Sequence, residues 1–453
     1  MRKKLLSALL CTTMVATMFA GCGSNSNDSS SSKKEAAEVS SEGKVLNIYC
    51  WNEEFKTRVT DHYADYEKVS ATEGKIGDVT VKWNITPNEN NAYQNNLDST
   101  LQKQDSAAAD DKIDMFLVEA DYALKYVDTD YTLDVKGDIG LTDDDLKEQY
   151  KYTQDIVTDS AGTLKGTSWQ GCPGVMFYNR DVAKEVLGTD DPAEVQKTVS
   201  DWDTYNETAK KMAKAGYTMT SSVNDTYRVY SNNVSSKWVS DDNKIQIDDN
   251  IMKWVDDSKA QVDAKETNTY DLWGDDWSKG FYPEGKVFCY FGPAWFVNFS
   301  MAADQDGSVG KAGKWAATEG PQGFFWGGTW MCAANGTDNA DLIKDIMLKL
   351  TCDADVMKGI VEKEDDFANN KSAMDAMAAT DYSSAILGGQ NPLPMYCANV
   401  ESISLDNLSA YDQGCNEEFQ KAMKDYFEGN ATKDEALDKF YKAVEEKYPE
   451  LSH

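Results

Sequence analysis

The sequence predicts an α/β protein in which mainly parallel sheets are covered by helices on both faces. Short apolar or alternating runs are followed repeatedly by segments with helical spacing, which is typical of parallel α/β folds. The chain has 453 residues, enough for one large or two medium domains after processing. Its 41% hydrophobic and 11% aromatic residues are typical of a globular protein.

The first half of the chain alternates clearly between the two kinds of pattern. Residues 45–50 form a short apolar run that predicts a strand. Asn52 is a suitable N-cap for a following helix, with apolar residues at helical spacing from Phe55 to Tyr66. The further elements expected in this half are strands at residues 79–85 and 113–118, and helices through Tyr93, Leu97 and Leu101 and at residues 122–127.

The second half predicts more helix. A capping box of Thr432 and Glu435 is expected to start the last helix. The chain has no internal repeat of solenoid or propeller period. The other elements expected here are strands at residues 175–178 and 287–291, and helices at residues 202–215, around 342–350 and around 419–427.

The N-terminus predicts export. Three basic residues precede an apolar run at residues 5–20 that is too short to span a membrane. The small residues before Cys22 resemble a bacterial lipobox, so residues 1–21 are expected to be a signal peptide and Cys22 to carry lipid. Residues 22–43 are polar and predict a flexible tether. The alternative is an ordinary secretory signal with an incidental cysteine.

Charge, histidines and cysteines exclude several classes of protein. The net charge of -32 argues against a nucleic-acid partner. Only His62 and His453 are present, so a histidine-rich metal site is excluded, and a serine protease triad would have to use His62. Of nine cysteines, seven remain beyond Cys22 without a CxxC pair. This indicates few disulfides or a reducing habitat, and no metal site is expected.

The order of several segments resembles extracellular solute-binding protein family 1, the carbohydrate-binding lipoproteins of ATP-binding-cassette importers related to maltose-binding protein. The resemblance covers essentially the whole mature chain. The segments that carry it are VLNIYCW at residues 45–51, IDMFLVE at 113–119, GTLKGTSWQGCPGVMFYNRDVA at 162–183, FYPEGKVFCYFGPAWF at 281–296, GGTWMCAANGTDNADLIKDIMLKLT at 327–351, DQ at 412–413 and DEALDKF at 434–440.

The resemblance implies a two-lobed periplasmic-binding-protein-like fold, with a mainly parallel sheet flanked by helices in each lobe and a ligand cleft between them. The chain would cross between lobes near residues 169–172 and 314–322. Ligand binding would close the hinge into the form that the importer recognises. The implied lobes are residues 44–170 plus 315–365 for the first, and residues 171–314 plus 366–453 for the second.

Candidate ligand-binding residues follow from the chemistry of sugars, which need aromatic planes for stacking and carboxylates or amides for their hydroxyls. Ligands of open α/β sheets lie at the carboxyl ends of the strands. The side chains expected there are Trp51, Asn52 and Glu53 after the first strand, and Glu119 and Asp121 after the third parallel strand.

The resemblance adds further candidates for the pocket. Trp169 and Gln170 correspond to a hinge position that is often aromatic and polar in the family. Trp273 and Trp277 share one face of a turn, which indicates a stacking platform, a lid or a core pair. The further residues that we expect to line the pocket are Trp169, Gln170, Tyr227, Trp273, Trp295, Trp330, Tyr411 and Asp412.

The function implied is capture of a sugar or short oligosaccharide by a monomer on the extracellular face of the membrane, and its delivery to an ATP-binding-cassette permease. No cofactor, nucleic acid or enzymatic activity is expected, and the membrane would be contacted through the lipid alone. The alternatives are a polyamine or other cation binder of the same fold, a glycoside hydrolase using Glu53 and Glu119, and a purely structural surface protein.

Overall fold

The computed structural model describes residues 39–302 and 304–453. The predicted signal peptide, the lipid-anchor Cys22 and most of the predicted tether lie outside these residues. The folded part begins before the predicted boundary at Lys44. The backbone N–H of Gly43 donates to Asp338 at 2.7 Å, and the N–H of Ala340 donates to the carbonyl of Ser40 at 2.9 Å.

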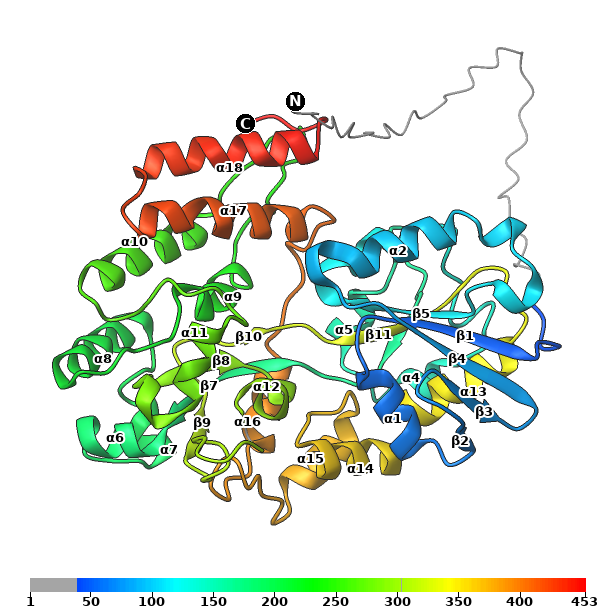
Figure 1. Cartoon of the computed structure of the whole chain (residues 1–453), viewed down its shortest axis with the longest axis horizontal. Coiled ribbons are helices and arrows are strands. Elements are labelled where there is room, and N and C mark those ends of the chain that lie inside the picture. Colours follow the sequence, from blue (N-terminus) through cyan, green and yellow to red (C-terminus); the bar gives the residue numbers. More distant parts are fainter. Residues whose placement is uncertain (1–38, 303) are drawn as a thin grey trace, which may run out of the picture. The chain divides into compact units, whose positions relative to one another are not determined.

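Two β-sheets organise the chain (Figure 1). The first sheet contains, in spatial order, β2 (Tyr66–Lys68), β3 (Glu73–Ile76), β4 (Val79–Ile85), β1 (Val45–Cys50), β5 (Met115–Glu119), β11 (Thr329–Ala333) and β6 (Thr167–Ser168). The second sheet contains β10 (Phe324–Phe325), β7 (Pro173–Asn179) and β8 (Cys289–Gly292), with β9 (Trp315–Thr318) also paired to β7. The predicted α/β class is confirmed, and the predicted strands at 45–50 and 79–85 coincide with β1 and β4.

The prediction that the strands of both sheets are mainly parallel is wrong. β1 pairs in parallel with β4 and β5, whereas the other pairs between named strands are antiparallel. The connections explain the difference. Strands β2, β3 and β4 follow one another through turns of a few residues, which can join only antiparallel neighbours, because a parallel pair needs a long crossover.

Helices surround both sheets. In Figure 1, α2 lies on one side of the first sheet, and α1 and α13 lie on the other. The helices are α1 (Glu54–His62), α2 (Ala92–Leu101), α3 (Ala123–Val127), α4 (Asp143–Leu146), α5 (Lys151–Asp155), α6 (Arg180–Leu187), α7 (Pro192–Gln196), α8 (Trp202–Ala215), α9 (Tyr227–Ser231), α10 (Asp249–Asp263), α11 (Asp275–Ser278), α12 (Ala294–Ser300), α13 (Ala340–Thr351), α14 (Ala354–Glu364), α15 (Lys371–Ala378), α16 (Leu393–Val400), α17 (Asp412–Phe427) and α18 (Lys433–Lys447).

The strongest local signals predicted helix boundaries well. Helix α8 spans the predicted residues 202–215, and α18 begins with the predicted capping box, in which Thr432 and Glu435 exchange hydrogen bonds. The first helix is shorter than predicted, because α1 ends at His62 and Tyr66 begins β2. Helices α10, α17 and α18 share an apolar cluster that contains Trp254, Phe419 and Phe440.

The strand pairing shows where the chain passes from one sheet to the other. The first passage lies between β6 and β7, where residues 169–172 were predicted to cross. The second comes later than the predicted residues 314–322, because β9 and β10 still pair with β7 and the chain joins the first sheet only at β11. A further segment runs beside the first passage, where the Gly171 N–H donates to Phe367 and the Asn369 N–H donates to Trp169.

All seven cysteines of the described residues are free thiols, and none is exposed. They are spread over both sheets and several helices. Burial raises the thiol pKa values, to about 12 for Cys50 and to about 11 for Cys397. Among residues 39–302 and 304–453, no helix has the length and apolar character needed to cross a membrane.

Candidate functional site

The carboxyl end of β5 presents two acidic side chains. Glu119 is the last residue of this strand and caps the short helical turn Ala120–Tyr122. Its carboxylate accepts a hydrogen bond from the backbone N–H of Asp121 at 2.8 Å. The local fold therefore fixes both acids at the edge of the first sheet where ligands of α/β proteins bind.

Arg228 of α9 approaches these acids from a distant part of the sequence. Its guanidinium donates to both carboxylate oxygens of Asp121, with 2.6 Å between Nη1 and Oδ1. The same group lies over the ring of Trp326, 5.7 Å from the centroid. Burial alone would lower the pKa of Arg228, but the adjacent Asp121 raises it, so the guanidinium is held in its charged form.

Aromatic side chains continue the site beyond Arg228. The Trp326 ring lies 5.6 Å from both Trp295 and Trp273, measured between centroids. Trp273 is 49% exposed and lies nearly parallel to Trp295, at 26° and 6.4 Å. Phe299 is 68% exposed and contacts both of these tryptophans. These four rings, which we call the aromatic platform, offer faces on which the C–H groups of a ligand can stack.

The glycine at residue 327 brings the acids and the aromatic platform together. Gly327 has a φ of +69°, a conformation that side chains rarely adopt. A Cβ atom at this position would lie 3.3 Å from Cζ2 of Trp295 and 3.4 Å from Oε1 of Glu119. The carboxylate and the indole therefore border the same small space, which a larger residue would fill.

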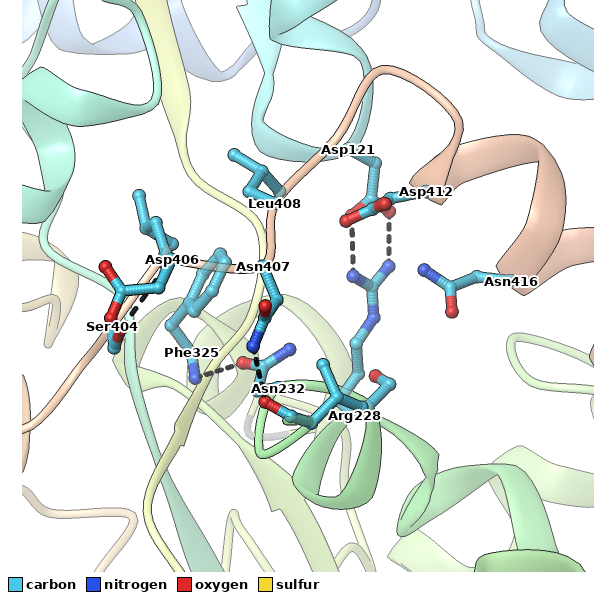
Figure 2. A pocket seen from close by; sticks show the side chains of 13 residues that line it. Asp121, Arg228, Asn232, Phe325, Ser404, Asp406, Asn407, Leu408, Asp412 and Asn416 are labelled. Carbon is cyan, nitrogen blue, oxygen red and sulfur yellow. Dashed lines mark hydrogen bonds and ion pairs between the residues drawn. The ribbon is translucent and has the colours of Figure 1, made fainter. Parts of the chain in front are cut away.

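A polar pocket lies next to this arrangement (Figure 2). The volume that water-sized molecules can occupy in it is about 90 Å³. Figure 2 shows the carboxylates of Asp121 and Asp412 beside each other, with Arg228 pointing toward them and Asn416 next to the guanidinium. The lining residues are Asp121, Arg228, Ser231, Asn232, Val234, Phe325, Ser404, Leu405, Asp406, Asn407, Leu408, Asp412 and Asn416.

Backbone hydrogen bonds hold two of the amides that line the pocket. The Asn232 oxygen accepts from the backbone N–H of Phe325 at 2.7 Å, and Asn407 donates to the carbonyl of Val234 at 2.7 Å. Because each amide has one group engaged in this way, its orientation is fixed while its other group can serve a ligand.

The environment of the site changes the acidity of its carboxyl groups. Burial, reinforced by the neighbouring Asp121, raises the pKa of Glu119 to about 8, while Arg228 acts in the opposite direction. Burial also raises the pKa of Asp412 to about 6, although a hydrogen bond from Ser409 favours its ionised form. Glu119 is therefore mostly protonated at neutral pH and can donate a hydrogen bond to a ligand oxygen.

Five predicted site residues lie in this region: Glu119, Asp121, Trp273, Trp295 and Asp412. The three predicted after β1 are not among the residues that line the pocket. Trp51 packs edge-on against Tyr93 and Tyr122. Asn52 accepts a hydrogen bond from the Glu54 N–H, and Glu53 is exposed and paired with Lys56.

The other predicted residues are engaged elsewhere. Trp169 is 0% exposed and stacks on Phe55, and Trp330 is 1% exposed and donates to the carbonyl of Thr153 at 2.7 Å. Neither offers a face to a ligand in this structure. The remaining three are Gln170, buried between Glu54 and Asp366, Tyr227, buried and bonded to Asn416, and Tyr411, whose hydroxyl donates to Glu450.

Several residues of the site were missed from the sequence. Arg228 directly follows the predicted Tyr227, which itself points into the core. Trp326 belongs to the segment FFWGG, where two glycines of positive φ follow the aromatic residues; glycine pairs of this kind are a signal for close approach of backbone to a ligand. Nothing in the sequence singles out Asn232, Asn407 or Asn416.

The acidic side chains described in this region are not arranged as a metal site. Within the part of the chain that the structure describes, no group of three or more His, Cys, Asp or Glu side chains is placed to hold a metal ion. The chemistry available at the site is hydrogen bonding by acids and amides, one charged guanidinium, and stacking on indole faces.

The chain is similar to known proteins in sequence and in fold. Residues 64–385 match the family model described as bacterial extracellular solute-binding protein. No curated protein matches the chain. A solved structure titled extracellular solute-binding protein family 1 is 19% identical, with a TM-score of 0.70, and the match covers 89% of this chain and 99% of that one.

Two further solved structures contain sugars. The transporter-associated binding protein of B. animalis subsp. lactis Bl-04, in complex with beta-1,6-galactobiose, has a TM-score of 0.66 at 19% identity over 91% of this chain and 99% of that one. The galacto-N-biose/lacto-N-biose I-binding protein of Bifidobacterium longum, in complex with lacto-N-biose, has a TM-score of 0.65 at 14% identity over 91% and 100%. These matches confirm the predicted two-lobed α/β fold.

Proposed function

The chain belongs to the family of bacterial extracellular solute-binding proteins, and we propose that it captures a sugar or short oligosaccharide and delivers it to an ATP-binding-cassette permease. The observation that carries the proposal is the space bordered by Glu119 and Trp295 at Gly327, beside Arg228 and the polar pocket. Acids and amides match sugar hydroxyls, and indole faces match the C–H surface of the rings.

The sugar complexes of these two solved binding proteins support this choice of ligand class. They are binding proteins of ABC transporters by name, so capture without chemical conversion is the function we propose for this chain. Glu53 and Glu119, the two carboxylates of the glycoside hydrolase alternative, lie in different surroundings. Glu53 is exposed beside Lys56, whereas Glu119 is half-buried at the end of β5. A binding role uses the acids as hydrogen-bonding groups and needs no such pair.

We also propose that the protein acts as a monomer on the outer surface of the cell, held there by lipid on Cys22. The support is the sequence of residues 1–22, together with the extracellular family to which the chain belongs. Acyl chains contribute about 0.8 kcal/mol for each buried CH₂ group, so acylation at two or more positions would retain the protein stably. Mass spectrometry of the N-terminal peptide from cells tests the lipid.

A cationic solute is the second candidate, and one observation favours it. The carboxylates of Asp121, Asp406 and Asp412 line the pocket together with a single guanidinium. An ammonium group would gain attraction from acids that Arg228 does not neutralise. This candidate and the sugar share the site, so one screen separates them.

The test is a thermal-shift screen of the purified protein against mono-, di- and oligosaccharides, with putrescine and spermidine in the same panel. A ligand at 100 times its Kd stabilises the folded state by about 2.7 kcal/mol, which is measurable. A shift with one sugar series, lost in Trp295→Ala, is the expected result. A shift with polyamines alone would overturn the sugar assignment, and a sugar shift unchanged in Trp295→Ala would overturn the proposed site.

A further inference from the structure

We propose that Asp121 and Arg228 form a charge filter, which lets the pocket bind neutral sugars and reject sugars that bear a carboxylate or sulfate group. The inference rests on the proposed function, because it assumes that this pocket receives the sugar. It assigns a role in ligand specificity to Asp121 and Arg228, and it restricts the expected ligands to neutral sugars.

Asp121 occupies the edge of Arg228 that its two terminal nitrogens form, and its carboxylate neutralises the positive charge of the guanidinium. Both of its terminal nitrogens donate to the two oxygens of Asp121, in the bidentate geometry that carboxylates and guanidinium groups prefer. The side chain is held further by Trp326, over whose ring the guanidinium lies. An anionic ligand would have to compete with Asp121 for this edge and for the positive charge of Arg228.

No second cation lines the pocket to take the place of Arg228. Among the described residues that form its wall, Arg228 is the only Lys, Arg or His side chain. Lys237 lies in the adjoining small pocket, which shares Asp412 and Asn416 with this one. The acids of the wall outnumber its cation, because Asp406 and Asp412 accompany Asp121.

The electrostatic consequence depends on where a ligand's charge would lie. An anionic group in the pocket would face Asp406 and Asp412, and the described residues of the wall offer no unpaired cation to offset their charge. Like charges brought together in an interface cost several kcal/mol. A neutral hydroxyl would meet the same carboxylates as hydrogen-bond acceptors. The Asp121–Arg228 pair therefore leaves a site whose free polar groups suit hydroxyls and repel acids.

The alternative is that the pair only supports the fold. A purely structural pair would make Asp121→Asn less stable but would leave the relative affinities for neutral and acidic sugars unchanged. If the charge filter operates, the same change removes the carboxylate that neutralises Arg228, and the guanidinium can then pair with the carboxylate of an acidic sugar. The ratio of two affinities in one variant separates these roles, because a loss of stability alone affects both ligands equally.

The experiment uses the full purified protein and three variants, Asp121→Asn, Arg228→Gln and the control Asp98→Asn. Asp98 is 33% exposed, pairs with Lys125 at 2.7 Å and accepts from the Tyr126 hydroxyl at 2.9 Å, so Asp98→Asn makes the same change in net charge away from the pocket. Isothermal titration gives the Kd for the neutral sugar found in the screen, for the corresponding uronic acid and for the corresponding amino sugar. Thermal unfolding without ligand shows that each variant is folded.

For wild type we expect the uronic acid to bind about 100-fold or more weaker than the neutral sugar, which corresponds to the several kcal/mol of like-charge repulsion. Asp121→Asn should improve the affinity for the uronic acid by about tenfold relative to the control. This improvement should become smaller as salt is added, because salt screens the charges. Arg228→Gln should instead favour the amino sugar, because it leaves Asp121 without its cation.

Equal binding of the neutral and acidic sugars by wild type would overturn the charge filter, and this measurement requires no variant. The inference would also be overturned if Asp121→Asn were folded and bound the uronic acid no better than Asp98→Asn does. If wild type binds no sugar of any charge, the proposed function itself fails.

Discussion

Replacing Glu119 by glutamine tests the half-buried acid at the centre of the site. Glutamine keeps an oxygen that can accept the hydrogen bond now donated by the Asp121 N–H at 2.8 Å, so the turn after β5 should persist. What the change removes is the ability to ionise. Any difference between wild type and Glu119→Gln that varies with pH therefore reports the titration of this carboxyl group.

The pKa of Glu119 rises from 4.5 to about 8 in the folded protein, mainly because of burial. Between these values the folded state holds a proton that the unfolded state has released, so the free energy of unfolding falls as the pH rises. The stabilisation is complete below about pH 4.5 and lost above about pH 8. At about 1.4 kcal/mol per pKa unit the full effect is about 5 kcal/mol, and a half-buried carboxylate reached by water should show about 2 to 3 kcal/mol.

Urea unfolding at pH 5, 7 and 9 measures the free energy of unfolding for both proteins. We expect the free energy of unfolding of Glu119→Gln, relative to that of wild type, to increase by about 2 to 3 kcal/mol between pH 5 and pH 9. Glu53→Gln is the control, because that side chain is exposed beside Lys56. A constant difference between Glu119→Gln and wild type across this range would refute the assignment of a protonated acid at the site.

Three other substitutions separate binding from folding. Trp273→Ala, at an exposed position of the aromatic platform, should weaken oligosaccharide binding by about tenfold in titration calorimetry without lowering the Tm; an unchanged Kd would count against stacking there. Trp330→Ala should lower the free energy of unfolding by about 3 to 5 kcal/mol, because this indole is buried and hydrogen-bonded; wild-type stability would contradict its core role. Gln170→Leu should cost about 2 kcal/mol in urea unfolding, because the buried amide donates to Glu54 and Asp366; no loss of stability would show that these acids find other donors.

Local patterns in the sequence predicted the regular elements of the fold. Alternation and apolar runs marked β1 and β4, and the capping box marked the start of α18. The directions of the strands were not predictable in the same way. They depend on which strands pair, and β9, β10 and β11 are short segments whose partners lie more than a hundred residues away in the sequence.

The candidate site was predictable in part for a similar reason. Glu119 and Asp121 follow a strand directly, so their location at the sheet edge could be predicted from the strand alone. Arg228 reaches Asp121 across 107 positions of the chain, and no local signal reports such a contact. Trp169 and Trp330 show the converse, since their residue type suits a sugar but their neighbours bury them completely.

The seven free thiols give the molecule a set of internal reporters. They are distributed across the structure, for example in β1, β8 and α17. Five of them are buried and so shielded from reagents while their own region stays folded, whereas Cys352 and Cys397 are partly exposed. Because regions of a protein open with different free energies, the rate at which each buried cysteine is alkylated measures the opening of its own neighbourhood. Mass spectrometry of the labelled peptides, with and without cargo, would then map which regions the ligand holds closed, without any label having to be introduced.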